Sequence, residues 1–374
     1  MRTEIVSDWR RFDELKKDWN TLLSLSRADI IFLRWEWIDT WRRIHGDAIK
    51  PFIVVAWDDA RNLAGIAPFY KTIYLLVRVL PYRVLRIMGD FPTGAECLDW
   101  ILRSDCEKEA ARCIADTLAK TADDWDLIWI PYVPLWTGGR DRIHEAAKDA
   151  GFYFSERDVG FGYIDLPGSL DDMLSAMGSS HRYNTRRDLK RMFSEPTTVF
   201  FRCVEEQDIS RYLDSLFHLH SIRWSREGQL GTFRRKPNEA MFYRLFALEA
   251  HKQGWLGLYG VEYSGEIKAV QYGYIYNGSF LQMQEGFDQE RGRGLGNLLR
   301  FKVIEDLISG GIKVYDFLGE MSEHKNRWHA TERTGRHLMI GNRKLKNRIL
   351  FSNNVWPTGR YLKPSEIEIF RGQQ

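Results

Sequence analysis

The chain has 374 residues, a length that predicts two domains, each large enough to bury its own core. Hydrophobic residues make up 44% of the sequence and charged residues 28%, which are the proportions of a globular protein. The formal net charge of +3 excludes a protein whose whole surface binds polyanions, although single basic segments can still do so.

The first half of the chain has the pattern of helices followed by strands. Apolar residues recur every three or four positions between residues 5 and 45, which indicates helix. Short β-like runs follow at residues 52–57, 64–71 and 83–89. A helix at residues 108–122 and one more strand, "WDLIWIPYV", complete the pattern. This order predicts an α/β domain over residues 1–166.

The second half, residues 167–374, follows a similar plan and suggests a duplicated fold. Helices are expected at residues 209–224 and 239–253, after a basic helix and a short strand. The β-like runs "WLGLYGVEY", "EIKAVQYGYIYNG" and "SFLQMQEGF" come next, joined by turns that contain glycine. A glycine loop, an apolar helix and the strand "GGIKVYDFL" close the pattern. We therefore predict two tandem α/β domains, each a twisted mixed sheet flanked by helices.

The stretch "DQERGRGLGNLL", residues 288–299, joins a strand to the apolar helix. A strand–helix–strand unit this short makes its strands parallel neighbours, so the loop lies where α/β sheets bind ligands. The glycines allow backbone amides to face one point, and the helix N-terminus and two arginines add positive charge. A phosphate ligand is expected, and the alternative is a glycine-rich helix start. The P-loop and dinucleotide-binding patterns do not match, because Asn297 and Leu298 follow a G-x-G-x-G spacing.

The spacing Arg291-x-x-Gly294-x-Gly296 resembles the loop with which GNAT-superfamily acyltransferases hold the pyrophosphate of coenzyme A. Two further stretches resemble the tandem-GNAT acyltransferases of the CelD/BcsL type, which are related to the Fem aminoacyltransferases. The residues that carry this resemblance are Leu219, His220, Arg223 and Trp224, and then Asp316, Phe317, Lys325, Arg327 and Trp328. The chain departs from that family at Gly319-Glu320-Met321 and at His324, where members often have Arg-Gly-Asp and Tyr.

The resemblance implies that the second domain binds acyl-coenzyme A, and that the first domain is a degenerate copy that shapes the acceptor site. In that fold the strands on either side of the loop and its helix separate, and the thioester arm inserts between them. Backbone amides near residues 284–287 would then stabilise the oxyanion of a tetrahedral intermediate. The expected donor-binding residues are Gln284, Gly286, Phe287, Arg291, Gly292, Arg293, Gly294, Leu295, Gly296 and Asn297.

Direct attack of an amine on the thioester requires a base and an acid near the cleft. Glu285 and Glu320 are the candidate bases, although Glu285 could equally be a charge on the solvated side of its strand. His324 or Tyr315 could protonate the leaving thiolate. The sequence contains neither a G-x-S-x-G elbow nor a cysteine in a catalytic context, which favours direct attack without a covalent enzyme intermediate. No Asp, His or Cys group has metal-ligand spacing, and we expect no metal.

Five residues are candidates for substrate binding: His220, Arg223, Trp224, Lys325 and Arg327. For His220 the alternative is a packed, hydrogen-bonded histidine on an amphipathic helix. For Lys325 and Arg327 the alternative is a surface salt bridge.

The segment at residues 181–191 predicts a basic helix, whose Arg and Lys side chains form two columns at i, i+4 spacing. It could be a solvated surface, or it could bind transfer RNA, an acyl-carrier protein or an anionic membrane surface. The sequence shows no signal peptide and no transmembrane segment, and a cytoplasmic location with reduced cysteines is expected.

The favoured function is an N-acyltransferase that uses acyl-coenzyme A and an amine acceptor, which is a small molecule or a peptide. The first alternative is a Fem-like transferase that takes an aminoacyl group from transfer RNA. The second is a non-catalytic GNAT-like module in envelope or polysaccharide synthesis.

Overall fold

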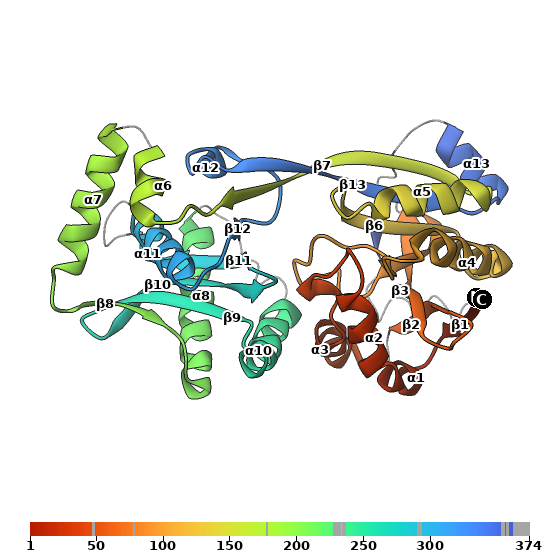
Figure 1. The fold of residues 1–374 in the computed structure, drawn as a ribbon, viewed down its shortest axis with the longest axis horizontal. Coiled ribbons are helices and arrows are strands. Elements are labelled where there is room, and N and C mark those ends of the chain that lie inside the picture. The colour runs from red at the N-terminus through yellow and green to blue at the C-terminus, as the bar shows by residue number, and fades with distance from the viewer. Residues whose placement is uncertain are drawn as a thin grey trace. The chain divides into compact units, whose positions relative to one another are not determined.

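A computed structural model describes residues 1–46, 49–77, 79–176, 179–226, 233, 237–289, 294–352, 356 and 359–361. The chain divides into two units (Figure 1), Met1–Gly160 with Thr334–Gln374 and Phe161–Arg333. The sequence predicted a boundary at residues 166/167 and a second domain running to residue 374. The observed boundaries of the units differ from the predicted ones because β7 (Tyr153–Asp165) and β13 (Thr331–Gly341) each begin in one unit and end in the other. The segment after Thr334 therefore belongs to the first unit.

The sheet of the first unit has the strand order β1-β2-β3-β4-β6-β13. Its other strands are β1 (Arg2–Val6), β2 (Lys50–Trp57), β3 (Leu63–Leu76), β4 (Leu80–Ile87) and β6 (Leu127–Pro134). Two short strands, β5 (Ile101–Leu102) and β14 (Gly359–Tyr361), pair with β3. The pair β4 and β6 is parallel, and the other neighbours in this order are antiparallel. The helices are α1 (Trp9–Glu14), α2 (Lys16–Ser24), α3 (Trp35–His45), α4 (Glu107–Lys120), α5 (Gly139–Asp149) and α13 (Leu345–Ser352).

The aromatic residues of the first unit form its core. Trp19, Trp37 and Trp41 come from the helices that the apolar periodicity predicted, and all three are fully buried. Each of these three indole N–H groups donates to a backbone carbonyl, as Trp19 does to Leu33 at 2.9 Å, so their burial leaves none of the three unsatisfied. Packing in this unit therefore accounts for part of the high tryptophan content.

The sheet of the second unit has the order β7-β12-β11-β10-β9-β8. Its strands, besides β7, are β8 (Thr198–Arg202), β9 (Leu256–Tyr263), β10 (Glu266–Tyr276), β11 (Ser279–Phe287) and β12 (Val314–Asp316). The pair β11 and β12 is parallel, and the other neighbours in this order are antiparallel. The helices are α6 (Leu170–Ala176), α7 (Ser179–Phe193), α8 (Glu206–Arg226), α10 (Pro237–Lys252), α11 (Leu295–Ser309) and α12 (Glu323–Asn326).

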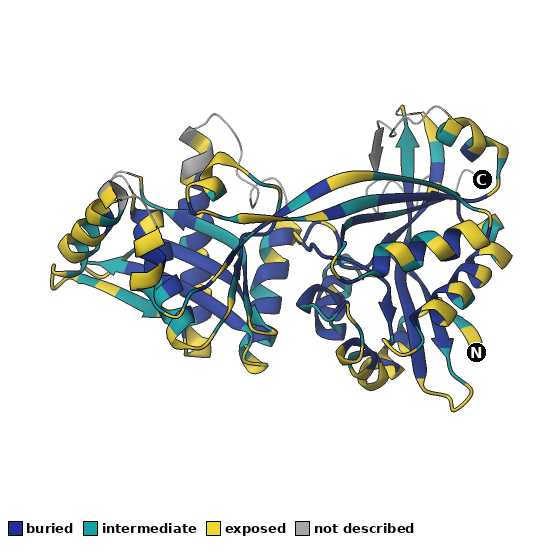
Figure 2. Ribbon diagram, turned by 45° about the horizontal axis from the view of Figure 1, so that its top comes forward, coloured by how far each residue is buried: buried dark blue, intermediate teal, exposed yellow. Residues whose placement is uncertain are grey.

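Helices cover both faces of the second sheet, and its central strands are mostly buried (Figure 2). Gly286 of β11 lies against the backbone of α8, and the next residue, Phe287, packs its ring on Gly296 of α11. Because consecutive residues of a strand point to opposite faces, α8 and α11 cover opposite sides.

The two sheets share one topology. In each, a hairpin (β2/β3 or β9/β10) precedes a strand that crosses over through a helix, α4 or α11, to a parallel neighbour. In each, the strand beyond the parallel pair is antiparallel and crosses the boundary between the units, as β13 and β7 do. The predicted tandem arrangement of two mixed sheets flanked by helices is confirmed.

Candidate active site

The parallel strands β11 and β12 pair over three positions only, Ser279–Leu281 against Val314–Asp316. β11 then continues to Phe287, and its register against β10 shifts between Tyr272 and Gly273. After β12 the chain turns away through Leu318 and Gly319, which both have positive φ. Among the described strands, none pairs with this edge of β11 beyond Leu281. The strands thus separate beside the N-terminus of α11.

The glycine loop enters α11 through Gly294, the N-cap residue, whose φ of 100° favours glycine. Gly296 is required for a different reason, since a Cβ atom there would lie 2.8 Å from the ring of Phe287. Leu295 is buried in the core, whereas Asn297 is exposed. Of the other predicted loop residues, Arg291, Gly292 and Arg293 lie outside the described residues.

A buried guanidinium occupies the α11 face of the separating strands. Arg300 of α11 is 1% exposed and forms an ion pair with Glu285 of β11. The same Glu285 oxygen accepts hydrogen bonds from the side-chain amides of Gln271 (3.4 Å) and Gln282 (3.2 Å). Burial opposes the charge of Arg300, but Glu285 and Tyr315 together more than offset this, and the pKa of Arg300 is raised. Arg300 therefore keeps its charge although it is buried.

Two predicted acids, Tyr315 and His324, contact the same guanidinium. The hydroxyl of Tyr315 accepts from Arg300 Nε (3.2 Å) and donates to Gln282 Oε1 (2.8 Å). Tyr315 is fully buried, and burial raises its pKa, so it stays protonated. His324 is exposed, and its Nε2 lies 3.0 Å from Arg300 Nη1. Arginine can only donate, so Nε2 of His324 accepts and its proton is on Nδ1.

The opposite face of β11 meets α8. Gly286 allows α8 to approach closely, since a Cβ atom there would lie 3.0 Å from the carbonyl oxygen of Leu216. His220 of α8 is buried, and its ring contacts that of Phe233 at 4.9 Å. Gln284 forms a hydrogen bond with the buried Tyr243. The side chains of Arg223 and Trp224 lie outside the described residues.

Asp316 lies where the strands separate, at the end of β12. It is opposite Leu281 in the register and on the other face of the sheet from Tyr315. Its Oδ1 accepts a hydrogen bond from the backbone N–H of Leu318 at 2.8 Å. Burial raises the pKa of Asp316 to about 6, although Leu318, Arg333 and Lys325 oppose the shift. The carboxyl therefore titrates near neutral pH and is a further candidate base.

The segment after β12 is held by Lys325. Its Nζ donates to the carbonyl oxygens of Leu318, Gly319 (2.7 Å) and Glu320 (2.8 Å), which uses all three of its protons. The Glu320 side chain is exposed and takes no part in the Arg300 network. Arg327 forms an exposed i, i+4 ion pair with Glu323 at 2.6 Å. These contacts give Lys325 and Arg327 structural roles in the described structure.

Sequence reasoning did not select Arg300, Gln271 or Gln282. Arg300 interrupts an apolar run, "LGNLLRFKVIEDLI", and it is four residues after Gly296, which places both on one face of the helix. A lone arginine on the buried face of a helix requires an acidic partner, and Glu285 in the preceding strand was the available one. That combination was the signal for this network.

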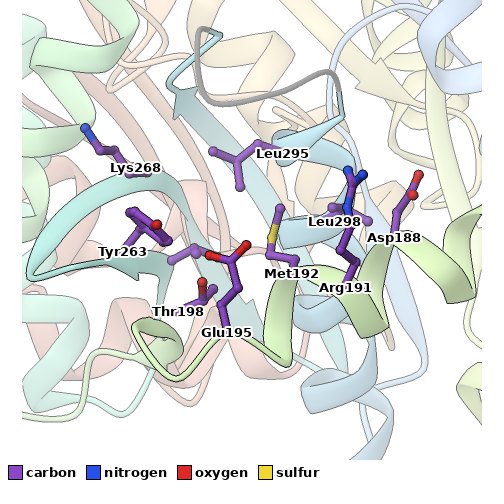
Figure 3. A pocket seen from close by; sticks show the side chains of 10 residues that line it. Asp188, Arg191, Met192, Glu195, Thr198, Tyr263, Lys268, Leu295 and Leu298 are labelled. Carbon is purple, nitrogen blue, oxygen red and sulfur yellow. The ribbon is translucent and has the colours of Figure 1, made fainter.

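A pocket of about 310 Å³ lies beside the first turn of α11 (Figure 3). Leu295 and Leu298 of α11 and Met192 of α7 are apolar residues of its lining. The charged residues of the lining are Asp188, Arg191, Glu195 and Lys268.

The predicted basic helix is α7, and much of its surface is exposed. Tyr183 is 68% exposed. Two of its arginines have acidic partners, because Arg186 pairs with Asp171 (2.6 Å) and Arg187 with Asp188 (3.0 Å). The side chain of His181 lies outside the described residues.

Residues 179–326 match the family described as Acetyltransferase (GNAT) domain. A crystal structure of FemX is similar, with a TM-score of 0.63 and 12% identity over 95% of this chain and all of that one. A conserved protein of unknown function from Bacteroides thetaiotaomicron matches with a TM-score of 0.54, 11% identity and coverage of 91% and 100%. The C-terminal domain of a putative lysylphosphatidylglycerol synthetase from Agrobacterium fabrum matches with a TM-score of 0.51, 10% identity and coverage of 93% and 99%.

No curated protein sequence matches the chain significantly. The structural matches establish the fold, and the family match places a GNAT acetyltransferase domain in the second half. Within the described ranges, no helix has the length and apolarity needed to cross a bilayer. Nor do three or more His, Cys, Asp or Glu side chains in those ranges form a group that could hold a metal.

Proposed function

We propose that the protein is an N-acyltransferase whose second unit binds acyl-coenzyme A and transfers the acyl group to an amine. The observation that carries this proposal is the separation of β11 from β12 beside the glycine-led start of α11. The unpaired edge of β11 offers backbone N–H groups to a thioester carbonyl, and the helix N-terminus favours the pyrophosphate. The GNAT domain match over residues 179–326 supports the same assignment.

In this proposal the amine nitrogen attacks the thioester carbonyl carbon, the C–N bond forms and the C–S bond breaks. The amine loses a proton to a base, and the thiolate gains one. Asp316 suits the role of base, because it lies at the separation and its pKa of about 6 leaves it ionised at neutral pH. Glu285 is committed to Arg300, and Glu320 has no contact with the network.

His324 is the candidate donor of a proton to the thiolate through its Nδ1–H, with solvent water returning a proton to the exposed ring. It is exposed and linked to Arg300, whereas the hydroxyl of Tyr315 is buried and already donates to Gln282. Tyr315 is better suited to positioning Arg300 than to direct proton transfer.

A Fem-like transfer of an aminoacyl group from transfer RNA is the second candidate. The exposed side chains of α7 favour it, because Lys190 and Arg191 are exposed cations with no ion pair among the described residues. Together with coenzyme A as the donor, we propose that the protein is a tandem-GNAT acyltransferase of the CelD/BcsL type.

Two glycines permit a matched test of donor binding. Gly294 and Gly265 both have positive φ, and a Cβ atom at either would meet no atom within 4 Å. Gly294→Ala therefore adds backbone strain at the loop, whereas Gly265→Ala adds comparable strain in the β9–β10 hairpin. We expect Gly294→Ala to weaken coenzyme A binding about tenfold or more, about 1.4 kcal/mol, in calorimetry. Gly265→Ala should stay within about twofold of the unmodified protein.

Equal effects of the two substitutions would contradict the donor site at the loop. Absence of coenzyme A binding together with salt-sensitive binding of aminoacyl-transfer RNA would instead establish the second candidate.

A further inference from the structure

The first unit contains a cavity of about 500 Å³ beside β3 and β4. Four side chains of its lining are cationic, namely Lys50, Lys71, Arg83 and Lys346. Two are carboxylates, Asp124 and Asp126. The cations outnumber the acids in a chain whose total net charge is only +3, so the cavity is a local concentration of positive charge.

Asp126 offsets part of this charge, and its carboxylate is fully engaged. It is 1% exposed and accepts hydrogen bonds from the backbone N–H of Arg83 (2.8 Å) and from Lys344 Nζ (3.2 Å). Lys346 Nζ lies 2.8 Å from its Oδ2. Burial opposes ionisation, but the hydrogen bonds from Arg83 and Lys346 hold the pKa of Asp126 at about 2. This carboxylate is therefore shared among three cations at neutral pH.

Two cations of the lining, Lys50 and Lys71, do not contact that carboxylate. Lys71 instead pairs with Asp124 at 3.7 Å, and its Nζ lies 4.6 Å from the centre of the Phe52 ring. Lys50 is exposed and has no ion pair within the described parts of the chain. Arg83 reaches Asp126 through Nε and Nη2, and half of its side chain is exposed. Cations gathered at one cavity repel each other, and a bound anion would relieve that repulsion.

We propose that this cavity binds a small molecule that carries a phosphate or diphosphate group. Arginine and lysine are the usual partners of phosphate, and Thr72 adds a hydroxyl to the lining. Ile73, Pro81 and Val84 supply apolar wall for an organic group. The volume exceeds that of a phosphate ion, which favours a phosphorylated organic molecule. The site belongs to the first unit and does not depend on the donor assignment.

The test uses the full chain with pyrophosphate and glycerol 3-phosphate as probes, measured by calorimetry at constant ionic strength. The cavity variant is Lys50→Met with Lys71→Met, neither of which contacts Asp126. The matched control is Lys108→Met with Lys120→Met, which removes the same charge from exposed positions on α4. We expect the cavity variant to bind at least one probe about tenfold more weakly and the control to bind as the unmodified protein does.

Gly294→Ala is the third protein in the test, and it should retain binding of the probes that the cavity variant loses. This result would assign the anion to the first unit whether or not the second unit binds coenzyme A. Equal weakening in the cavity variant and the control would show a general charge effect and overturn the site. The proposal would also be overturned if citrate bound as tightly as the phosphate probes, or if neither probe bound the unmodified protein.

Discussion

The two units differ most at one equivalent place, the opening beyond their parallel strands. In the first unit β4 and β6 pair over three positions, as β11 and β12 do in the second. In the first unit the chain then fills the opening itself, because the fully buried Leu98 donates its backbone N–H to the carbonyl of Tyr132 at 3.1 Å. In the second unit no described strand lies beside this edge of β11 after Leu281.

The connecting segments differ in charge, because that of the first unit is acidic and that of the second unit is neutral. Between β4 and α4 the first unit has the buried acids Asp90, Glu96 and Asp99. Asp90 pairs with Arg86 at 2.7 Å, and Asp99 accepts from the hydroxyl of Thr137 at 2.8 Å. Between β11 and α11 the second unit has glycines and two arginines, whose charge is balanced by Asp288 and Glu290. The first unit thus holds part of its own chain beside the parallel pair, whereas β11 has no described strand beside it after Leu281. This difference is why we place donor binding in the second unit.

The largest expected effect at a single pH comes from breaking the Arg300 network in the second unit. Arg300→Met leaves Glu285, whose side chain is 17% exposed, without its counter-charge, which costs at most about 3 kcal/mol of unfolding free energy. Glu285→Gln combined with Arg300→Met should recover most of that loss, because no charge is then stranded. Chemical denaturation measures both. A double variant no more stable than Arg300→Met would contradict the account of the pair.

The next largest effect is the pH dependence of stability that Asp99 causes, a residue in the segment between β4 and α4 of the first unit. Burial raises the pKa of Asp99 to about 7, well above its value in an unfolded chain. Such a group stabilises the fold below about pH 4, and this contribution is lost as the pH rises through about 7. Relative to Asp99→Asn, the unmodified protein should therefore lose at most about 4 kcal/mol of stability between pH 4 and pH 8.

Thermal unfolding across that pH range checks the Asp99 prediction. Asp123→Asn, at an exposed position in the same unit, is the control and should follow the unmodified protein at every pH. A constant difference between Asp99→Asn and the unmodified protein would show that Asp99 does not titrate as described.

The smallest expected effect is a change in kcat that distinguishes His324 from Glu320, the two candidate proton-transfer residues after β12. His324→Ala should lower kcat about 10–100-fold with little change in stability, because His324 is exposed but contacts Arg300. Glu320→Gln should leave kcat within about twofold, since that side chain is exposed and outside the network. Steady-state kinetics with an acyl-coenzyme A and an accepted amine compares them. A larger loss of kcat in Glu320→Gln than in His324→Ala would contradict the choice of His324 as the proton donor.

Much of the fold follows from local patterns in the sequence. The alternating runs of β9, β10 and β11 and the apolar stripe of α11 indicated their own structure and order. The helical region at residues 5–45 is three helices and a 3₁₀ turn, because Leu15 ends one helix as the next begins. The spacing of apolar residues alone does not show where one helix ends and the next begins.

The candidate site was harder to predict, because its contacts join distant residues. Gly296 was selected as a phosphate-loop glycine, and its packing requirement comes from Phe287 across the loop. Arg300 and Glu285 meet only after β11 and α11 have packed together. The return of residues 334–341 to the first unit likewise depends on pairing with β6, which no local pattern encodes.

Hydrogen–deuterium exchange of the full chain with and without coenzyme A tests the central comparison most directly. Bound donor should slow exchange of backbone amides at residues 282–287 and 294–299 of the second unit. Exchange at residues 88–106, the equivalent segment of the first unit, should not change. Protection at residues 88–106 without protection in β11 and α11 would contradict the assignment of donor binding to the second unit.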